Sequence, residues 1–259
     1  MLKKCCSVVL ACSAILLSGC AMFCQNEQQT VKAVYTSVPP KMNGVLDDPV
    51  WQKAPEYTLV FSEREFKNAR PEVAEFFKNG ITDQGTFRLL WDENYLYVGI
   101  NCKDLDIVAE GVEDQQPHDK IGDVAGIMLK PVDDTYFWHI YVSPRNGKKV
   151  SFYKARGLVG LPSTHPKELP FKMLSSAHIK GTLNSSFDKD TGWTAIMAIP
   201  IKDLNSKGVK LEPGVRWKVL LYRINRSRYL PVSETGIYPK TPSSSQTAYE
   251  DFGNLELVR

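Results

Sequence analysis

The amino-acid sequence predicts an all-β protein, a two-sheet antiparallel β-sandwich of jelly-roll type with one or two short helices. Short runs rich in β-branched and aromatic residues recur along the chain at 87–91, 95–102, 124–129, 136–142, 193–199, 217–224 and 252–258. Turn-forming residues separate the runs, as at Asp92-Glu93-Asn94 and Glu212-Pro213-Gly214. Helical patterns are scarce and too short to cross over between parallel strands. We therefore expect antiparallel sheets packed face to face.

The N-terminus has the features of a bacterial export signal. Lys3 and Lys4 precede an apolar run, 5–17, which is long enough for a signal-peptide core and too short to span a bilayer. The run ends in Leu17-Ser18-Gly19-Cys20, which resembles the bacterial lipobox, in which the cysteine thiol takes a diacylglycerol. We expect residues 1–19 to be removed as a signal peptide and Cys20 to be lipidated. An ordinary cleaved signal with a chance cysteine is the alternative.

Lipidation would place the protein in the bacterial cell envelope, at the outer membrane or the cell surface, because acyl chains hold a protein on a bilayer without a spanning helix. Residues 20–32 are polar and rich in Gln, which predicts a lipidated tether. The folded domain is expected over 33–259. Cys24 lies in the tether, and Cys102 continues the apolar face of an alternating strand, so we expect no structural disulfide.

Two segments carry helical signals and two others are predicted loops. Asp48 precedes Pro49 at the start of 48–54, which provides a capping carboxylate and a proline at the first helical position. Residues 71–78 could form two turns. Residues 154–172 contain several prolines and 241–247 are rich in Ser. A loop of about 20 residues is usually either functional or disordered, and both interpretations stay open.

The composition and the motifs argue against several classes of function. The net charge is +3 and the basic residues are scattered without aromatic interleaving, so we expect no nucleic-acid partner. The histidines lack the spacing of zinc ligands, and we assign no metal ligands. No Gly-x-Ser-x-Gly motif, phosphate-binding loop or dinucleotide fingerprint occurs. We expect a protein without catalytic activity.

Five separated blocks resemble carbohydrate-binding module family 9 in order and approximate spacing. They are MNGVLDDPVWQKA (42–54), LWDENYLYV (90–98) followed by Lys103-Asp104, Asp123 with VSPRNG (142–147), GWTAIMAIP (192–200), and YRINR (222–226) with FGNLEL (252–257). Together they span 41–258. Trp51 and Trp193 lie among apolar neighbours and are expected in the core. The resemblance implies a β-sandwich, related to DOMON domains, that binds carbohydrate.

The sequence departs from the family where the sugar site is expected. The family clamps a terminal sugar between two aromatic rings. The first ring is expected a few residues before Asp123, where 118–121 contains none. The second is expected shortly before Phe252, where the chain offers Tyr249. An acidic residue expected three positions after Asp123 is replaced by Gly126.

The candidate carbohydrate-binding residues are His139, Tyr141, Tyr222, Arg223 and Tyr249. The resemblance places Tyr141, and Tyr222 with Arg223, at positions that contact sugar. Strand alternation puts His139 and Tyr141 on one face, where they could line a groove with Tyr222. The alternatives are satisfied aromatic residues in the core or on the surface, and a structural ion pair for Arg223.

A replacement aromatic ring could come from several other places in the chain. Tyr229, Tyr238, Trp138 and the long loop are the candidates, and the sequence does not choose among them. Related modules carry calcium, so structural calcium is an open expectation, although no run of alternating acidic residues singles out ligands. No other cofactor is expected.

We expect a membrane-anchored lipoprotein that binds a polysaccharide or oligosaccharide and supports glycan capture or degradation. Its expected partners are the carbohydrate, the bilayer through acylated Cys20, and glycan-degrading enzymes of the same system. Three alternatives stay open. A glycosidase would need two carboxylates around a cleft, for which the close pairs are Asp104 and Asp106, Glu110 and Glu113, and Asp133 and Asp134. A haem-binding DOMON-like electron-transfer domain could use Met128 as an axial ligand. A lipoprotein could also use the sandwich only as a scaffold.

Overall fold

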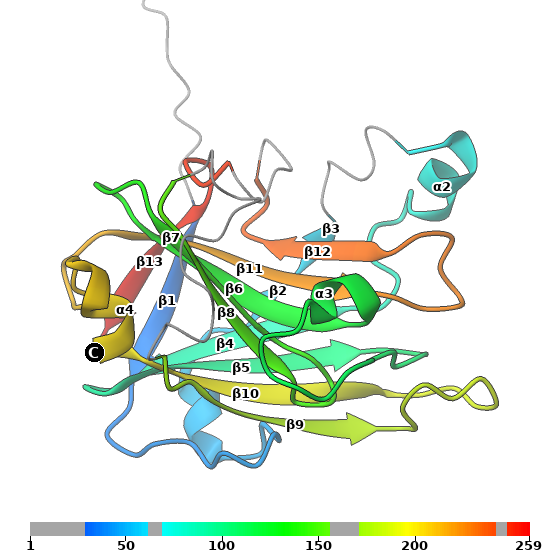
Figure 1. Cartoon of the computed structure of the whole chain (residues 1–259), viewed down its shortest axis with the longest axis horizontal. Helices are drawn as coiled ribbons and strands as arrows, with labels where there is room; N and C mark the ends of the chain where they lie inside the picture. The colour runs from blue at the N-terminus through cyan, green and yellow to red at the C-terminus, as the bar shows by residue number, and fades with distance from the viewer. Residues whose placement is uncertain (1–28, 62–68, 156–170, 242–247) are drawn as a thin grey trace, which may run out of the picture.

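The structure, a computed structural model, describes residues 29–61, 69–155, 171–241 and 248–259 (Figure 1). The predicted signal peptide, the lipidation site Cys20 and most of the predicted tether lie outside the described residues. So do 156–170 of the first predicted loop and 242–247 of the second. Within the described parts of the chain, no helix combines the length and the apolar character that a membrane span requires.

The chain is mostly strand, with a few helical turns at the connections. The strands are β1 (Thr30–Tyr35), β2 (Tyr57–Thr58), β3 (Val60–Phe61), β4 (Gly85–Trp91), β5 (Tyr95–Lys103), β6 (Val124–Pro131), β7 (Phe137–Val142), β8 (Lys148–Tyr153), β9 (Leu174–Lys180), β10 (Gly192–Pro200), β11 (Trp217–Asn225), β12 (Glu234–Tyr238) and β13 (Gly253–Val258). The helices are η1 (Pro49–Lys53), α2 (Pro71–Phe76), α3 (His118–Ile121), α4 (Ile201–Leu204) and η4 (Asn205–Lys207). The prediction of an all-β protein with short helices is confirmed.

The strands form one continuous mixed sheet that is nearly barrel-shaped. Its order is β8-β7-β6-β11-β13-β1-β4-β5-β10-β9, with β12 beside β11 and β3, and β2 beside β4. Strand β1 is parallel to both β13 and β4, whereas the other pairs are antiparallel. The prediction of two separate antiparallel sheets therefore needs correction. The parallel pairing of β1 with β13 joins the two ends of the domain, and local turn signals carry no information about it.

One apolar core lies between the two halves of this sheet. Strands β4, β5 and β10 contribute residues such as Ile100 and Trp193, and strands β6, β7 and β11 contribute residues such as Ile127 and Trp217. Every residue of β10 is buried, as the run of apolar side chains at both parities predicts. Cys102 is buried in this core, where burial raises the pKa of its thiol to about 12. The predicted core positions of Trp193 and Trp51 are also confirmed.

Each half of the sheet carries a second apolar cluster on the face turned away from the core. On β6, β7 and β11 this cluster includes Met128, Tyr141 and Tyr222. On β4, β5 and β10 it includes Tyr97 and Trp51, because the segment that contains η1 packs across these strands (Figure 1). The Asp48 side chain caps η1 by accepting from the Val50 amide at 3.2 Å, although the element is a 3-10 helix.

Candidate functional site

The predicted sugar-contacting residues lie on the outer face of β6, β7 and β11. Tyr141 pairs with Gly126, and Gly126 pairs with Tyr222, so both rings belong to one row across three strands. His139 lies one row away and faces the same side. The predicted shared face is therefore present, and we call His139, Tyr141, Tyr153 and Tyr222 the Tyr–His cluster.

A hydrogen bond joins two members of the cluster. The Tyr222 hydroxyl lies 2.6 Å from Nε2 of His139, and the two ring centroids are 5.3 Å apart. Burial lowers the pKa of His139 to about 4, so the imidazole is neutral near pH 7 and its Nε2 can accept a hydrogen bond from the Tyr222 hydroxyl. Burial also raises the pKa of Tyr222 well above its ordinary value. Both side chains are therefore uncharged near pH 7, and the hydrogen bond between them satisfies the Tyr222 hydroxyl and the His139 Nε2 atom.

Tyr141 is held from the side of α3. Its hydroxyl lies 2.8 Å from Oδ1 of Asp119 and 3.2 Å from the Gln116 carbonyl oxygen. Burial, followed by the neighbouring Asp119 charge, raises the pKa of the Tyr141 hydroxyl. Tyr141 and Tyr222 are both buried, so neither presents a ring face to solvent.

The geometry around Gly126 explains why no acidic side chain stands there. A Cβ atom at this position would lie 2.1 Å from the Ile140 carbonyl oxygen and 2.6 Å from Cβ of Tyr141. These contacts are too close for any side chain. Tyr141 and its strand therefore occupy the place where the resemblance implies an acid.

The last predicted aromatic residue, Tyr249, packs at the other end of β7. Its ring lies 5.3 Å from the Phe137 ring and 6.5 Å from the Phe252 ring, and the Lys130 ammonium lies 5.3 Å from its centroid. Tyr249 is buried and belongs to the same outer apolar cluster as Tyr141. It covers this face of the sheet instead of offering an open ring.

Arg223 points to the opposite side of β11, into the molecule. Its guanidinium donates to Asp104 at 2.8 Å and to the carbonyl oxygens of Asp83 and Lys103 at 2.7 Å. Both Arg223 and Asp104 are buried. Burial raises the pKa of nearby Asp123 well above its usual range, and the Asp104 charge adds to this effect. Arg223 thus has the structural ion-pair role that was the alternative to sugar contact.

The residues of the alternative functions also have structural contacts. Asp104 pairs with Arg223, and Asp106 pairs with Arg228 at 3.1 Å. Met128 is buried in the outer apolar cluster, which explains it as a packing residue. In the described part of the chain no three His, Cys, Asp or Glu side chains gather to hold a metal ion, so we assign no ligands for calcium.

The accessible part of the Tyr–His cluster is its rim. His139 and Tyr153 are partly exposed, and Tyr153 stacks on Phe137 at 4.7 Å with an interplanar angle of 11°. Asp119 is partly exposed beside them. Neither Tyr153 nor Asp119 is among the site residues predicted from the sequence. The alternation of 148–153 after the Asn146-Gly147 turn could have placed Tyr153 on this face.

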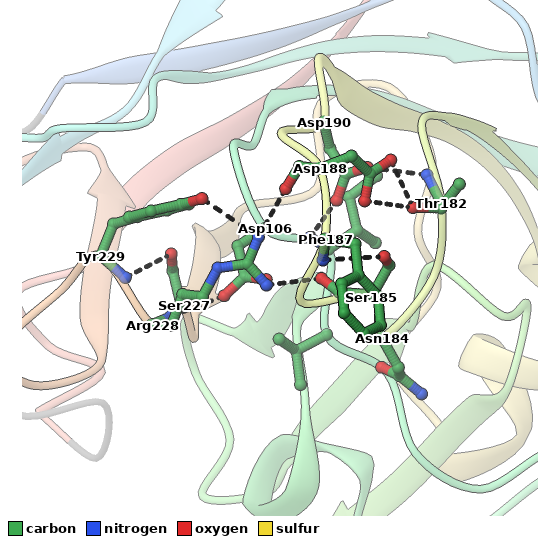
Figure 2. A network of polar contacts seen from close by, with 12 residues as sticks. Asp106, Thr182, Asn184, Ser185, Phe187, Asp188, Asp190, Ser227, Arg228 and Tyr229 are labelled. Carbon is green, nitrogen blue, oxygen red and sulfur yellow. Dashed lines mark hydrogen bonds and ion pairs between the residues drawn. The ribbon is translucent and has the colours of Figure 1, made fainter.

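A second group of aromatic residues lies in the connections at one end of the strands (Figure 2). Phe187, in the turn between β9 and β10, is 99% exposed, and Tyr229, after β11, is 38% exposed. The guanidinium carbon of Arg228 lies 4.8 Å from the Tyr229 ring centroid and the Lys189 ammonium lies 5.2 Å from it. We call Phe187, Lys189, Arg228 and Tyr229 the aromatic edge.

Buried and polar contacts fix the backbone beneath the aromatic edge. The Arg228 guanidinium donates to the carbonyl oxygens of Ser185 and Asp188, both at 2.5 Å, and its backbone amide donates to Asp106 at 2.6 Å. Asp188 accepts from the Thr182 hydroxyl at 2.7 and 2.8 Å. These contacts tie the β9–β10 turn to the segment after β11, so Phe187 stands on a supported backbone although its ring has no cover (Figure 2).

A link through α3 places the aromatic edge and the Tyr–His cluster at the same end of the molecule. Arg226 donates to the Asp119 carbonyl oxygen at 2.9 Å, two residues before Arg228 of the edge. Figure 1 shows α3, the β9–β10 turn and the β11–β12 connection at this end. Of the rings considered as replacements, Tyr229 is exposed here, whereas Trp138 is buried and Tyr238 packs against the core.

Comparison with known proteins finds similarity in structure alone. No family model matches the sequence, and no curated protein matches it significantly. A protein from Bacteroides uniformis, named as a candidate carbohydrate-binding protein, has a TM-score of 0.64 and 13% identity, with 89% of this chain and 99% of that chain covered.

Two structures of a family 9 carbohydrate-binding module from Caldicellulosiruptor kristjanssonii are also similar. The complex with cellotriose has a TM-score of 0.55 and 14% identity, over 89% of this chain and 94% of that chain. The complex with glucose has a TM-score of 0.53 and 15% identity, over 88% and 95%. These matches cover nearly the whole domain, as the five sequence blocks do. The protein therefore has a fold like that of carbohydrate-binding module family 9.

Proposed function

We propose that this protein binds carbohydrate without catalysing a reaction, and that the aromatic edge contacts the sugar. The observation that carries the proposal is Phe187, whose ring is 99% exposed above a turn held by hydrogen bonds. The exposed face of the Phe187 ring is open to a ligand, and the Tyr229 ring lies in the neighbouring connection (Figure 2). Sugars present a patch of C–H bonds that packs on such a ring face.

The polar side chains of the edge suit the hydroxyl groups of a sugar. Lys189 supplies a charged donor beside the Tyr229 ring, and Arg228 packs on the same ring while its guanidinium holds the turn. The Asp106 carboxylate holds the Arg228 guanidinium in place at 3.1 Å. A ring face with adjacent fixed donors is the combination that sugar sites use. The similarity in fold to carbohydrate-binding modules supports the same class of ligand.

The rim of the Tyr–His cluster is the second candidate location. His139 and Tyr153 are partly exposed beside the Asp119 carboxylate, and this is the face to which the sequence blocks point. Tyr141, Tyr222 and Tyr249 would then act from beneath, by supporting the ring of Tyr153 and the imidazole of His139. Substitution of one exposed ring at each location separates the two.

The experiment is a glycan array with the purified protein, followed by calorimetric titration of the best ligand. The Phe187→Ala variant should bind about tenfold more weakly, the equivalent of about 1.4 kcal/mol. The matched control Phe76→Ala removes an exposed ring from α2 and should bind like the wild type. Loss of binding in Tyr153→Ala, with Phe187→Ala unchanged, would move the site to the Tyr–His cluster. No binding to any glycan would refute the function.

We also propose that Cys20 anchors the protein to a membrane of the bacterial cell envelope, where it supports glycan capture for degrading enzymes. The lipobox-like sequence and the polar tether at 20–32 support this role. In cells, Cys20→Ala should shift the protein from the membrane fraction to the soluble fraction. An unchanged distribution would contradict the anchor. Hydrolysis of chromogenic glycosides by purified protein would favour the glycosidase alternative.

A further inference from the structure

A cleft of about 380 Å³ lies on the half of the sheet that contains β4, β5, β9 and β10, opposite the half that carries the Tyr–His cluster. None of the residues that line it belongs to the aromatic edge, although Lys180 ends β9 just before the turn that carries Phe187. The segment around η1 forms one wall, and the outer face of β4, β5, β9 and β10 forms the floor and the opposite side. The volume lies within the range of roughly 300–1,000 Å³ that small-molecule sites occupy. The cleft is therefore large enough to hold a ligand.

The cleft exists because the outer face of these strands changes from apolar to polar. In one row, Leu90 pairs with Tyr97 and Tyr97 pairs with Ala198, and η1 covers these side chains. Two rows further along, the corresponding position on β5 is Asn101, which pairs with Thr194. The polar part of the floor remains open beside the covered part.

Gly99 and Arg88 set the position of the wall. A Cβ atom at Gly99 would lie 2.9 Å from both Leu46 and the Trp51 ring, so the absence of a side chain lets the wall rest directly on β5. Arg88 donates to the carbonyl oxygens of Ala54 at 2.8 Å and Trp51 at 3.2 Å. The wall is held before any ligand arrives, which reduces the ordering that binding requires.

Four polar side chains around the cleft have no hydrogen-bond or ion-pair partner among the residues that the structure describes. They are Asp47, Gln52, Asn101 and Lys180. The set contains one carboxylate, one ammonium group and two amides, so it offers donors and acceptors together. Arg88 is already paired with Glu56 at 3.1 Å.

The charges around the cleft point to a neutral ligand. Asp47 and Lys180 oppose each other in sign, and the Arg88–Glu56 pair adds no net charge. A phosphate or carboxylate ligand would gain little here, because a carboxylate group of the protein balances each of the two cationic side chains. A polyhydroxylated ligand can donate to the carboxylate and accept from the ammonium and amide groups, while the partly exposed side chains of Val45 and Leu46 meet its C–H bonds.

We propose that this cleft is a second binding site, separate from the aromatic edge, for one or two residues of a neutral saccharide. The residues that line the cleft indicate this class of ligand, which agrees with the proposed function. The choice of test ligands rests on that proposed function. Two sites with separate lining residues would let one protein contact two segments of a polysaccharide and raise its avidity.

The test is calorimetric titration with neutral trisaccharides, namely cellotriose, xylotriose and maltotriose, at 50 and 500 mM NaCl. With a trisaccharide that binds, the wild type should take up two ligands per chain and show no loss of affinity at high salt. The double variant Asn101→Ala/Lys180→Ala alters only side chains that lack partners, so the fold should persist. It should bind one ligand, with the cleft site at least tenfold weaker. The control Lys202→Ala, an exposed lysine on α4, should leave both sites unchanged.

The outcomes separate this site from the aromatic edge. Two sites in the wild type, of which the double variant loses one and Phe187→Ala loses the other, support both proposals. One site that only the double variant removes supports the cleft and refutes the edge. One site that only Phe187→Ala removes refutes the cleft and leaves the proposed function intact. Absence of binding to all three trisaccharides refutes the cleft site, and the glycan array then decides the proposed function.

Discussion

The Tyr–His cluster and the aromatic edge contain similar side chains in opposite environments. In the cluster, Tyr222 is 0% exposed and its hydroxyl contacts His139 at 2.6 Å. In the edge, Phe187 is 99% exposed while the backbone around it is tied by Arg228 and Thr182. In the cluster the rings are satisfied and stabilise the sheet. In the edge, hydrogen bonds hold the backbone of the turn, and the Phe187 ring remains accessible to a ligand.

Aromatic and polar residues on one strand face therefore do not by themselves make a binding site. A ring that packs on its neighbours contributes to the stability of the fold, and a ring that water can reach can contribute to binding. The two regions should therefore respond to substitution in opposite ways, and the following predictions test that contrast.

The largest expected effect is on stability, at the buried cluster. Tyr222→Ala should lower the free energy of unfolding by about 3–5 kcal/mol, because it leaves a cavity and removes the donor to His139. The matched variant Tyr229→Ala at the edge should cost no more than about 1 kcal/mol. Urea unfolding of both variants measures the difference. Equal losses would show that the two regions do not differ in the way described.

The next effect concerns the support beneath the edge. Asp106 is buried and accepts from the Arg228 amide at 2.6 Å, so Asp106→Ala should lower the free energy of unfolding by about 1–3 kcal/mol. The control Asp133→Ala removes an exposed ion pair with Arg216 and should cost at most about 1 kcal/mol. Thermal unfolding distinguishes them, and a neutral Asp106→Ala variant would contradict the supporting role.

Phe187→Ala should reverse the pattern of Tyr222→Ala. The ring makes almost no buried contact, so the free energy of unfolding should stay within about 0.5 kcal/mol of the wild type. The same variant should lose about tenfold in sugar affinity. Parallel unfolding and titration experiments provide both values. A large loss of stability would show that the ring packs in the folded protein.

A separate test of the buried cluster is the response of His139 to pH. Burial lowers its pKa to about 4 from an ordinary value of 6.5, so between these values the unfolded chain binds a proton that the folded chain does not. Its contribution to stability is fully present above about pH 6.5 and is lost as the pH falls towards 4. Urea unfolding at pH 7 and pH 5 should show a smaller loss for His139→Gln than for the wild type. Identical losses would place the imidazole in solvent.

Much of the fold follows from local sequence patterns. Two strands form with the expected burial: the alternating run that ends at Cys102, and the run at 193–199, which is apolar on both faces. The spacing and hydrophobicity of neighbouring side chains are enough to predict such strands. The parallel partnership of β1 with β13 and β4 could not be predicted in this way. The β1–β13 pair joins segments from opposite ends of the domain, and no tight turn connects β1 with either of its partners.

The candidate site was less predictable than the fold. Alternation correctly put His139 and Tyr141 on one face, but it does not indicate whether another segment covers that face. Tyr249 and α3 provide the cover, and their packing depends on the whole fold. Phe187 lies in a polar turn, Ser185 to Asp190, where a single aromatic residue was the available signal. Its exposure becomes evident only when the contacts of its turn are known.

The most direct measurement is the affinity of wild type and Phe187→Ala for the best ligand of the glycan array, with Tyr153→Ala titrated beside them. We predict saturable binding by the wild type, a loss of about tenfold in Phe187→Ala, and little change in Tyr153→Ala. Equal affinity of the wild type and Phe187→Ala would contradict the assignment of sugar binding to the exposed edge.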